Sequence, residues 1–119
     1  MTDKRYDKPI PFGWYALDYS EGLGPGEVRS LHYFDRDLVL FRTDSGEVRL
    51  LDAYCPHLGA HLGYGGSVQG EFIACPFHGW QFDGHGVCRE VPYAKNMPPR
   101  VEGKQTIRSY PTLERNHMI

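Results

Sequence analysis

The stretch between residues 55 and 88 constrains the fold of this chain more than any other part of its sequence. Ten of its residues are glycine or proline: Pro56, Gly59, Gly63, Gly65, Gly66, Gly70, Pro76, Gly79, Gly84 and Gly86. Glycine adopts backbone conformations that other residues avoid, and it lets the backbone come close to a ligand. Only short strands fit between these residues, and we expect them at 72–74, 80–82 and 87–89. The stretch is therefore predicted to form loops that wrap closely around a bound group.

Short extended runs separated by turn residues make up most of the remaining chain. They predict strands at residues 12–17, 28–34, 38–42, 48–51 and 105–110. Polar turns at 35–37 and 44–47 would join the middle three strands into an antiparallel meander. No stretch repeats apolar residues at the spacing of a helix. The sequence therefore predicts an all-β fold.

The length of the chain, 119 residues, allows one domain with a buried core and little more. Because the glycine-rich stretch lies in the middle of the chain, we expect it to be inserted into a base formed by both ends. We predict a single domain over residues 1–119, with an antiparallel β-sandwich base from residues 12–51 and 92–113. Residues 52–91 would form the small inserted subdomain.

Charge and hydropathy exclude several classes of partner. The chain has 13 lysine and arginine residues against 15 aspartate and glutamate residues, a net charge of -2. This balance gives no electrostatic reason to bind nucleic acid or an anionic membrane. The N-terminus has no apolar signal region, and no apolar run reaches the length of about 18 residues that a membrane span needs. We expect no nucleic-acid partner, no membrane and no secretion signal.

The three cysteines are Cys55, Cys75 and Cys88, an odd number that suits a disulfide framework poorly. Such a set is better explained by metal ligation in a reducing compartment, so we expect a cytoplasmic protein. Cys88 stands apart from the loops that hold the other two, and we expect it to be a buried free thiol.

Two short motifs carry the chemistry of the chain. Cys55-Pro56-His57 is separated by seventeen residues from Cys75-Pro76-Phe77-His78, so that each motif offers one thiolate and one imidazole. Two cysteines and two histidines suit either zinc or the Rieske type of 2Fe-2S cluster. Zinc ligands usually have about two to four residues between them, whereas Cys55 and His57 have one. The spacing favours a cluster in which the cysteines serve one iron and the histidines the other.

At these motifs the chain resembles Rieske domains. The segments 55–60 and 75–80 match the family motif C-x-H-x(n)-C-x-x-H, and the resemblance extends over nearly the whole chain. It implies a Rieske fold with one Rieske-type 2Fe-2S cluster, in which Cys55 and Cys75 ligate one iron and His57 and His78 the other. His61 lies close to this set, but the set is complete without it, so we expect a structural or surface role.

Departures from the motif indicate the branch of the family. Respiratory-chain Rieske proteins clamp the two loops with a disulfide, at positions that are Ala60 and Phe77 here. They also donate two hydroxyl groups to the cluster sulfurs from positions that are Trp80 and Phe82 here, and we expect these two side chains in the subdomain core. Fewer hydrogen bonds to sulfur lower the reduction potential. The resemblance therefore implies the soluble branch of the family.

Flanking residues resemble one group of Rieske oxygenases, the ketosteroid hydroxylases and cholesterol desaturases. The similar segments are Asp52-Ala53-Tyr54 and Val91-Pro92-Tyr93-Ala94. In such enzymes the domain takes electrons from an NAD(P)H-dependent reductase or a ferredoxin. It passes them to a mononuclear iron site, where oxygen is activated. The resemblance also implies a trimer.

The chain does not contain the ligands of that mononuclear iron, so we assign no catalytic residue and expect electron transfer without catalysis by this chain alone. The family supplies those ligands from a later domain, and residues 112–117 resemble the segment that leads into it. Two alternatives remain open at this point. One is a stand-alone Rieske ferredoxin that acts as an electron carrier, and the other is a zinc-stabilised binding module.

Overall fold

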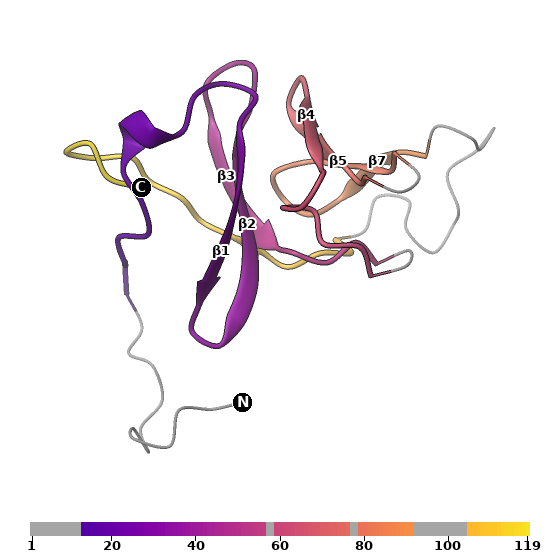
Figure 1. Ribbon diagram of the computed structural model, residues 1–119, viewed down its shortest axis with the longest axis horizontal. Helices are drawn as coiled ribbons and strands as arrows, with labels where there is room; N and C mark the ends of the chain where they lie inside the picture. The colour runs from indigo at the N-terminus through magenta and orange to yellow at the C-terminus, as the bar shows by residue number, and fades with distance from the viewer. Residues whose placement is uncertain (1–12, 57–58, 77–78, 92–104) are drawn as a thin grey trace.

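The computed structural model describes residues 13–56, 59–76, 79–91 and 105–119. These residues form two antiparallel sheets of four strands each, in the orders β1-β2-β3-β8 and β4-β5-β6-β7 (Figure 1). The strands are β1 Val28–Tyr33, β2 Arg36–Arg42, β3 Val48–Asp52, β4 Ser67–Gln69, β5 Phe72–Ala74, β6 Gln81–Phe82, β7 Cys88–Glu90 and β8 Ser109–Tyr110. A single 3-10 turn, η1 Ser20–Gly22, accompanies them. The described residues contain no α-helix, and the all-β prediction is confirmed.

The three strands of the central meander are confirmed, although β2 begins at Arg36, two residues before its expected start. Three other segments differ from the prediction. Residues 13–17 of the strand expected at 12–17 are not a strand, and Phe12 lies outside the described residues. The run 105–110 pairs with the first sheet over its last two residues alone, as β8. The short strand β4 was not predicted, because Val68 is its one apolar residue and the alternation that marks a strand is absent.

The strand β2 buries side chains on both faces of the first sheet. Val39 and Phe41 belong to one apolar core, and Leu38 and Leu40 belong to another. Successive side chains of a strand point to opposite faces, so a run of buried residues means that both faces are covered. The base is therefore one four-stranded sheet with a core on each side of it, as far as the described residues go.

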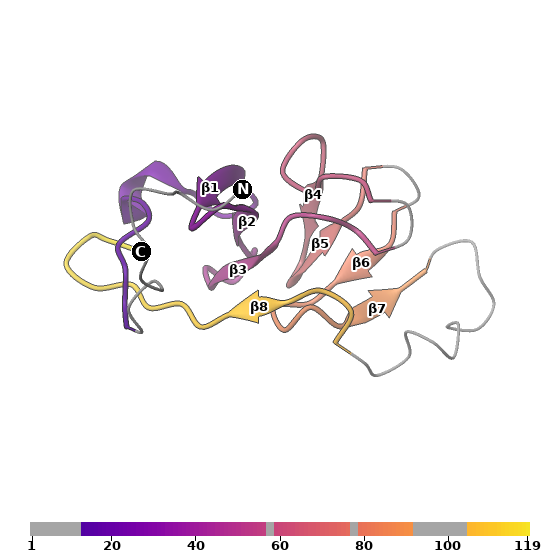
Figure 2. The same ribbon diagram turned by 90° about the horizontal axis from the view of Figure 1, so that it is seen from below.

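The first core joins the two sheets. Its members come from β2 and β3, from the second sheet and the loops around it, and from Ile107 beside β8: Val39, Phe41, Leu51, Cys55, Ala60, Leu62, Ile73, Cys75, Trp80, Phe82, Cys88, Val91 and Ile107. Both Trp80 and Phe82 are buried there, as expected. Figure 2 shows the second sheet at one end of the molecule and the C-terminus at the other, joined by the segment that contains β8.

The hairpin between β1 and β2 has a two-residue turn. Tyr33 pairs with Arg36, so that the turn is Phe34-Asp35 and not the expected 35–37. Both turn residues have positive φ, 57° at Phe34 and 59° at Asp35. This is the backbone of a type I′ turn, which matches the twist of the strands and normally carries asparagine or glycine. The phenylalanine hid the turn in the sequence, because a bulky side chain rarely adopts positive φ.

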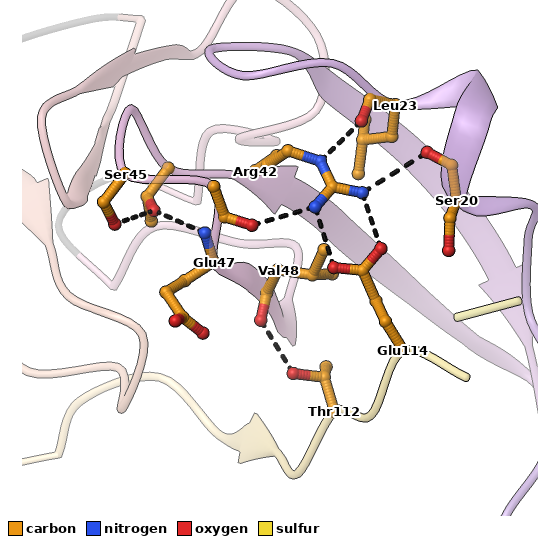
Figure 3. Close-up of polar contacts among 10 residues, drawn as sticks. Ser20, Leu23, Arg42, Ser45, Glu47, Val48, Thr112 and Glu114 are labelled. Carbon is orange, nitrogen blue, oxygen red and sulfur yellow. Dashed lines mark hydrogen bonds and ion pairs between the residues drawn. The ribbon is translucent and has the colours of Figure 1, made fainter. Parts of the chain in front are cut away.

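The side chain of Arg42, at the end of β2, ties together three segments that are far apart in the sequence (Figure 3). Its Nη1 and Nη2 atoms donate to the two carboxylate oxygens of Glu114, at 2.7 and 2.8 Å. Its Nε donates to the carbonyl oxygen of Leu23 at 2.5 Å, and Nη1 also donates to that of Gly46 at 2.8 Å. A further contact of 3.3 Å reaches the carbonyl oxygen of Ser20. The C-terminal segment is therefore fixed to the base.

Replacing Glu114 with glutamine is expected to lower the free energy of unfolding at neutral pH by about 1 kcal/mol, because a two-pronged ion pair is lost. Hydrogen bonding from Arg42 lowers the pKa of Glu114 below its ordinary value of 4.5. A carboxyl group whose pKa is lowered by folding stabilises the folded state at pH values above its ordinary pKa. This contribution is lost as the pH falls through the lowered pKa. The difference between wild type and variant should therefore shrink towards about pH 3.

Chemical denaturation at neutral pH and at about pH 3 measures both differences. The control variant is Glu47→Gln, which removes an exposed carboxylate from the neighbouring turn. A difference for Glu114→Gln that is the same at both pH values would contradict the prediction.

Candidate metal centre

The two cysteine loops have the same backbone hydrogen bonds. In the first, the Cys55 N–H donates to the carbonyl of Ala60 at 2.8 Å, and the Gly59 N–H donates to the carbonyl of Cys55 at 2.8 Å. In the second, the Cys75 N–H donates to the carbonyl of Trp80 at 2.8 Å. The Gly79 N–H likewise donates to the carbonyl of Cys75, at 3.1 Å. Each loop is therefore closed on its cysteine in the same way.

Glycine is required at one position of each loop. Gly59 has a φ of 75° and Gly79 a φ of 74°. These values lie in the left-handed region, which a side chain at Cβ disfavours. The sequence thus explains the shared loop shape, because both motifs place glycine four residues after cysteine.

Both loop cysteines are buried and neither forms a disulfide. Cys55 is 1% exposed and Cys75 is 5% exposed, and neither belongs to a disulfide. The two cysteines belong to the same core. The segment that follows the first loop also contacts the second loop, since a Cβ atom built on Gly65 would be 3.3 Å from Cβ of Pro76. Two buried thiols in adjacent, identically closed loops are the donors that a soft metal centre requires.

The two motif histidines, His57 and His78, lie outside the described residues, and their ligand role stays a prediction. Within the residues that the structure describes, no group of three or more His, Cys, Asp or Glu side chains could hold a metal ion. Half of the predicted donor set is among them, namely Cys55 and Cys75. The chemistry of this set, two thiolates and two imidazoles, fits a Rieske-type cluster.

A carboxylate of the base holds the stem of the first loop. Asp37, on β2, accepts a hydrogen bond from the hydroxyl of Tyr54, the residue directly before Cys55. Its carbonyl accepts the N–H of Ala53 at 3.1 Å. The other carboxylate oxygen of Asp37 lies 2.8 Å from Nδ1 of His32. Hydrogen bonds from Tyr54 and His32 lower the pKa of Asp37, and the same carboxylate raises the pKa of Tyr54.

Aromatic rings continue this contact along the loop. The ring of His61 lies 5.2 Å from that of Tyr54 and 4.3 Å from that of Tyr64, between centroids. The Gly63 N–H donates to Nδ1 of His61 at 2.9 Å, so this histidine has the structural role that was expected. The role of Asp37 in holding the first loop could not be predicted, because the acidic residues of the first strands have the pattern of a solvent-exposed face. Asp37 lies beside Tyr54 only because of the register of the strands.

Replacing Tyr54 with phenylalanine is expected to speed the removal of bound iron by a chelator. The reason is that the first loop loses the hydrogen bond from Tyr54 to Asp37. The control is Tyr64→Phe, which keeps the ring beside His61. Absorbance decay in the presence of an iron chelator measures both rates. Equal rates for the two variants would show that the hydroxyl of Tyr54 does not hold the loop.

The third cysteine lies apart from this chemistry. Cys88 is 2% exposed, and its Sγ lies 3.7 Å from the carbonyl oxygen of Glu90. Burial raises the pKa of the Cys88 thiol. A buried, protonated thiol packs as a small apolar group, so the expectation for Cys88 is confirmed.

Among the described residues, no helix has the length and hydropathy to cross a membrane.

Comparison with known proteins gives a consistent result. The family model described as the Rieske [2Fe-2S] domain matches residues 13–111. Cholesterol 7-desaturase nvd 1 of Ciona intestinalis is 41% identical over 110 residues, which are 92% of this chain and 23% of that protein. The oxygenase component of 3-ketosteroid-9-alpha-monooxygenase of Rhodococcus rhodochrous is 37% identical over 107 residues, which are 90% of this chain and 26% of that protein.

Solved structures with the same fold include dicamba monooxygenase with non-heme iron and dicamba. It has a TM-score of 0.72 and 32% identity, over 89% of this chain and 31% of that one. The oxygenase in a complex of carbazole 1,9a-dioxygenase with its ferredoxin has a TM-score of 0.72 at 24% identity, over 88% of this chain and 27% of that one, which shows the fold alone. This chain spans about a quarter of the length of the relatives that it matches.

Proposed function

The chain belongs to the Rieske [2Fe-2S] domain family, and from that premise we propose that it carries single electrons to the iron site of an oxygenase. The cysteine and histidine motifs alone allowed either zinc or a cluster. Membership of this family implies one Rieske-type 2Fe-2S cluster. When bound, such a cluster takes up and releases one electron at a time. The residues of this chain would hold it, shield it from water and influence its potential.

Four residues would hold the cluster: Cys55 and Cys75 on one iron, and His57 and His78 on the other. The observation that carries this proposal is the matched closure of the two loops on their buried cysteines. Residues 52–91 would act as the cluster-binding subdomain, with the base from residues 12–51 and 92–113. In support, the second sheet and both loops pack on the base through the first core.

The finer part of the proposal concerns partners. An NAD(P)H-dependent reductase or a ferredoxin would supply the electrons, and the acceptor would be a mononuclear iron site that this chain does not provide. The names of the relatives, a desaturase and a monooxygenase that act on steroids, favour a steroid-type oxygenase. A complex of an oxygenase with its ferredoxin, in a protein of the same fold, is consistent with such a donor. The proposal also includes assembly of the oxygenase as a trimer and a location in the cytoplasm.

The test is to purify the chain without oxygen and to measure iron, acid-labile sulfide and the electron paramagnetic resonance spectrum after reduction. Two irons and two sulfides per chain, with the spectrum of a mixed histidine and cysteine cluster, are the expected result. Reduction by a ferredoxin with its reductase, followed by absorbance, tests the donor. Zinc in place of iron and sulfide would overturn the proposal.

The reduction potential is expected near the low end of the Rieske range, at about -150 mV. The two positions that carry hydroxyl donors in high-potential relatives are the buried side chains of Trp80 and Phe82, which cannot donate an O–H to sulfur. Without such hydrogen bonds, the extra negative charge of the reduced state is less stabilised. A redox titration followed by circular dichroism measures the potential. A value above about +100 mV would be inconsistent with this assignment.

A further inference from the structure

Asp37 brings a negative charge to the stem of the first cysteine loop. Its carboxylate accepts a hydrogen bond from the hydroxyl of Tyr54, the residue directly before Cys55, and its carbonyl accepts the N–H of Ala53 at 3.1 Å. The pairing of β1 with β2 places His32 opposite Asp37, with Nδ1 of His32 at 2.8 Å from the carboxylate. Both the main chain and the side chain of Asp37 are therefore bound to this stem.

Within the described part of the chain, no cation compensates the charge of Asp37. The partners of its carboxylate are a phenol and an imidazole, which are ordinarily neutral at about pH 8. Hydrogen bonds from Tyr54 and from His32 lower the pKa of Asp37, so the carboxylate is ionised at neutral pH. Arg36, the residue before Asp37, instead pairs with Asp52 at 3.5 Å. As far as the described residues go, Asp37 adds an uncompensated negative charge to the stem.

This charge lies beside a part of the molecule that water screens poorly. The residues on either side of Tyr54 are buried, since Ala53 is 0% and Cys55 is 1% exposed. A charge acts more strongly through an interior of low dielectric constant than through water. The side chain of Asp37 is itself 38% exposed, so solvent and salt reduce its interaction with the loop without removing it.

We propose that Asp37 helps to set the reduction potential of the cluster, because its charge disfavours the uptake of an electron by the group that Cys55 holds. An added electron makes the centre more negative, and a neighbouring carboxylate repels that extra charge. Asp37 therefore acts through its charge as well as through its hydrogen bond with Tyr54. This inference rests on the proposed function, but it assigns a residue of the base, outside the two loops.

Asp37→Asn is the decisive variant, because it removes the charge and keeps the hydrogen bonds. The asparagine oxygen accepts the hydroxyl of Tyr54, and the asparagine amide donates to Nδ1 of His32. In the full chain with its cluster, at low ionic strength and about pH 8, the equilibrium with a redox mediator should move about threefold towards the reduced cluster. The matched control is Glu47→Gln, which removes an equal, exposed charge at the opposite end of β3 from Cys55 and should leave this equilibrium unchanged.

Ionic strength separates the charge of Asp37 from its part in holding the loop. Raising the salt concentration from about 0.01 M to about 1 M shortens the screening length from about 30 Å to about 3 Å. The difference in potential between wild type and Asp37→Asn should shrink severalfold, whereas the effect of a loosened loop would not depend on salt. A difference that is the same at both salt concentrations overturns the proposal, as does an equal shift in Glu47→Gln.

His32→Lys tests the same charge without changing Asp37. The side chain of His32 is 63% exposed on β1, so the strand has room for lysine, which places a cation beside the carboxylate. Compared with His32→Gln, which adds no charge, this variant should again move the equilibrium towards the reduced cluster. Equal potentials in the two His32 variants overturn the proposal, even if Asp37→Asn fails to retain its cluster.

Iron and sulfide content, measured on every sample, distinguishes the role of Asp37 from the proposed function. A wild-type chain that binds iron and sulfide, with a potential that responds neither to Asp37→Asn nor to His32→Lys, overturns the role of Asp37 alone. A wild-type chain without iron and sulfide overturns both.

Discussion

Replacing Cys75 with serine is expected to leave the purified chain colourless and without iron or sulfide. A serine hydroxyl has a much higher pKa than a thiol and is a poor ligand for a soft centre. Cys75 is 5% exposed in a loop closed by its own N–H and carbonyl, so the backbone holds its side chain in the core. The measurement is iron and sulfide content together with the visible spectrum, and the expected loss is nearly complete.

The chain offers a matched control in its third cysteine. Cys88→Ser replaces a thiol that is equally buried but lies on β7, outside both loops. This variant should keep the cluster and lose only the modest stability that an added buried hydroxyl costs, about 1 to 2 kcal/mol. Cluster loss in both variants would point to general unfolding. A cluster retained in Cys75→Ser would remove Cys75 from the ligand set.

Replacing Gly86 with alanine is expected to destabilise the chain by about 3 to 5 kcal/mol, more than the same replacement at any other glycine that the structure describes. A Cβ atom at this position would lie 1.8 Å from the carbonyl oxygen of Ile107, and the φ of Gly86 is 77°. The carbonyl of Gly86 also accepts the N–H groups of Thr106 and Ile107, at 2.9 and 3.1 Å. An added methyl group must push the segment at 106–107 away from the second sheet.

Gly70→Ala separates this clash from backbone strain. Gly70 has a φ of 63°, and a Cβ atom there would meet nothing within 4 Å. Its expected destabilisation is about 1 kcal/mol, from the left-handed backbone alone. Urea denaturation of the loaded chains measures the difference between the two variants. Similar destabilisation by both would mean that the contact of Gly86 with Ile107 relaxes at little cost.

The cysteine loops were the most predictable part of the molecule. Their shape is encoded within six residues each, and both motifs repeat the glycine that closes the loop on its cysteine. The strands β1, β2, β3 and β5 were also predicted, because alternation and turn residues mark them locally. The strands β6 and β7 were predicted to within one residue, at 80–82 and 87–89. Local sequence was sufficient wherever a short stretch determines its own backbone.

Contacts between distant segments could not be predicted. Asp37 reaches Tyr54 only because the register of β2 against β3 places Asp37 beside the stem of the first loop. Arg42 and Glu114 are 72 residues apart, and nothing near either residue marks the pair. The contact of Gly86 with Ile107 depends on how the second sheet docks on the base. Each of these is a property of the packed fold and has no signature in a short stretch of sequence.

The core that the two sheets share has a consequence for the speed of electron transfer. The side chains of Cys55 and Cys75 belong to the same close-packed core as Val39, Phe41 and Leu51 of the base. Close-packed interiors resist displacement, so these two sulfur atoms would move little when a bound group changes its charge. A small nuclear rearrangement means a low reorganisation energy, because the surroundings are already arranged for the product state. The base sheet would thus contribute to the rate constant of electron exchange through its packing against these two cysteines.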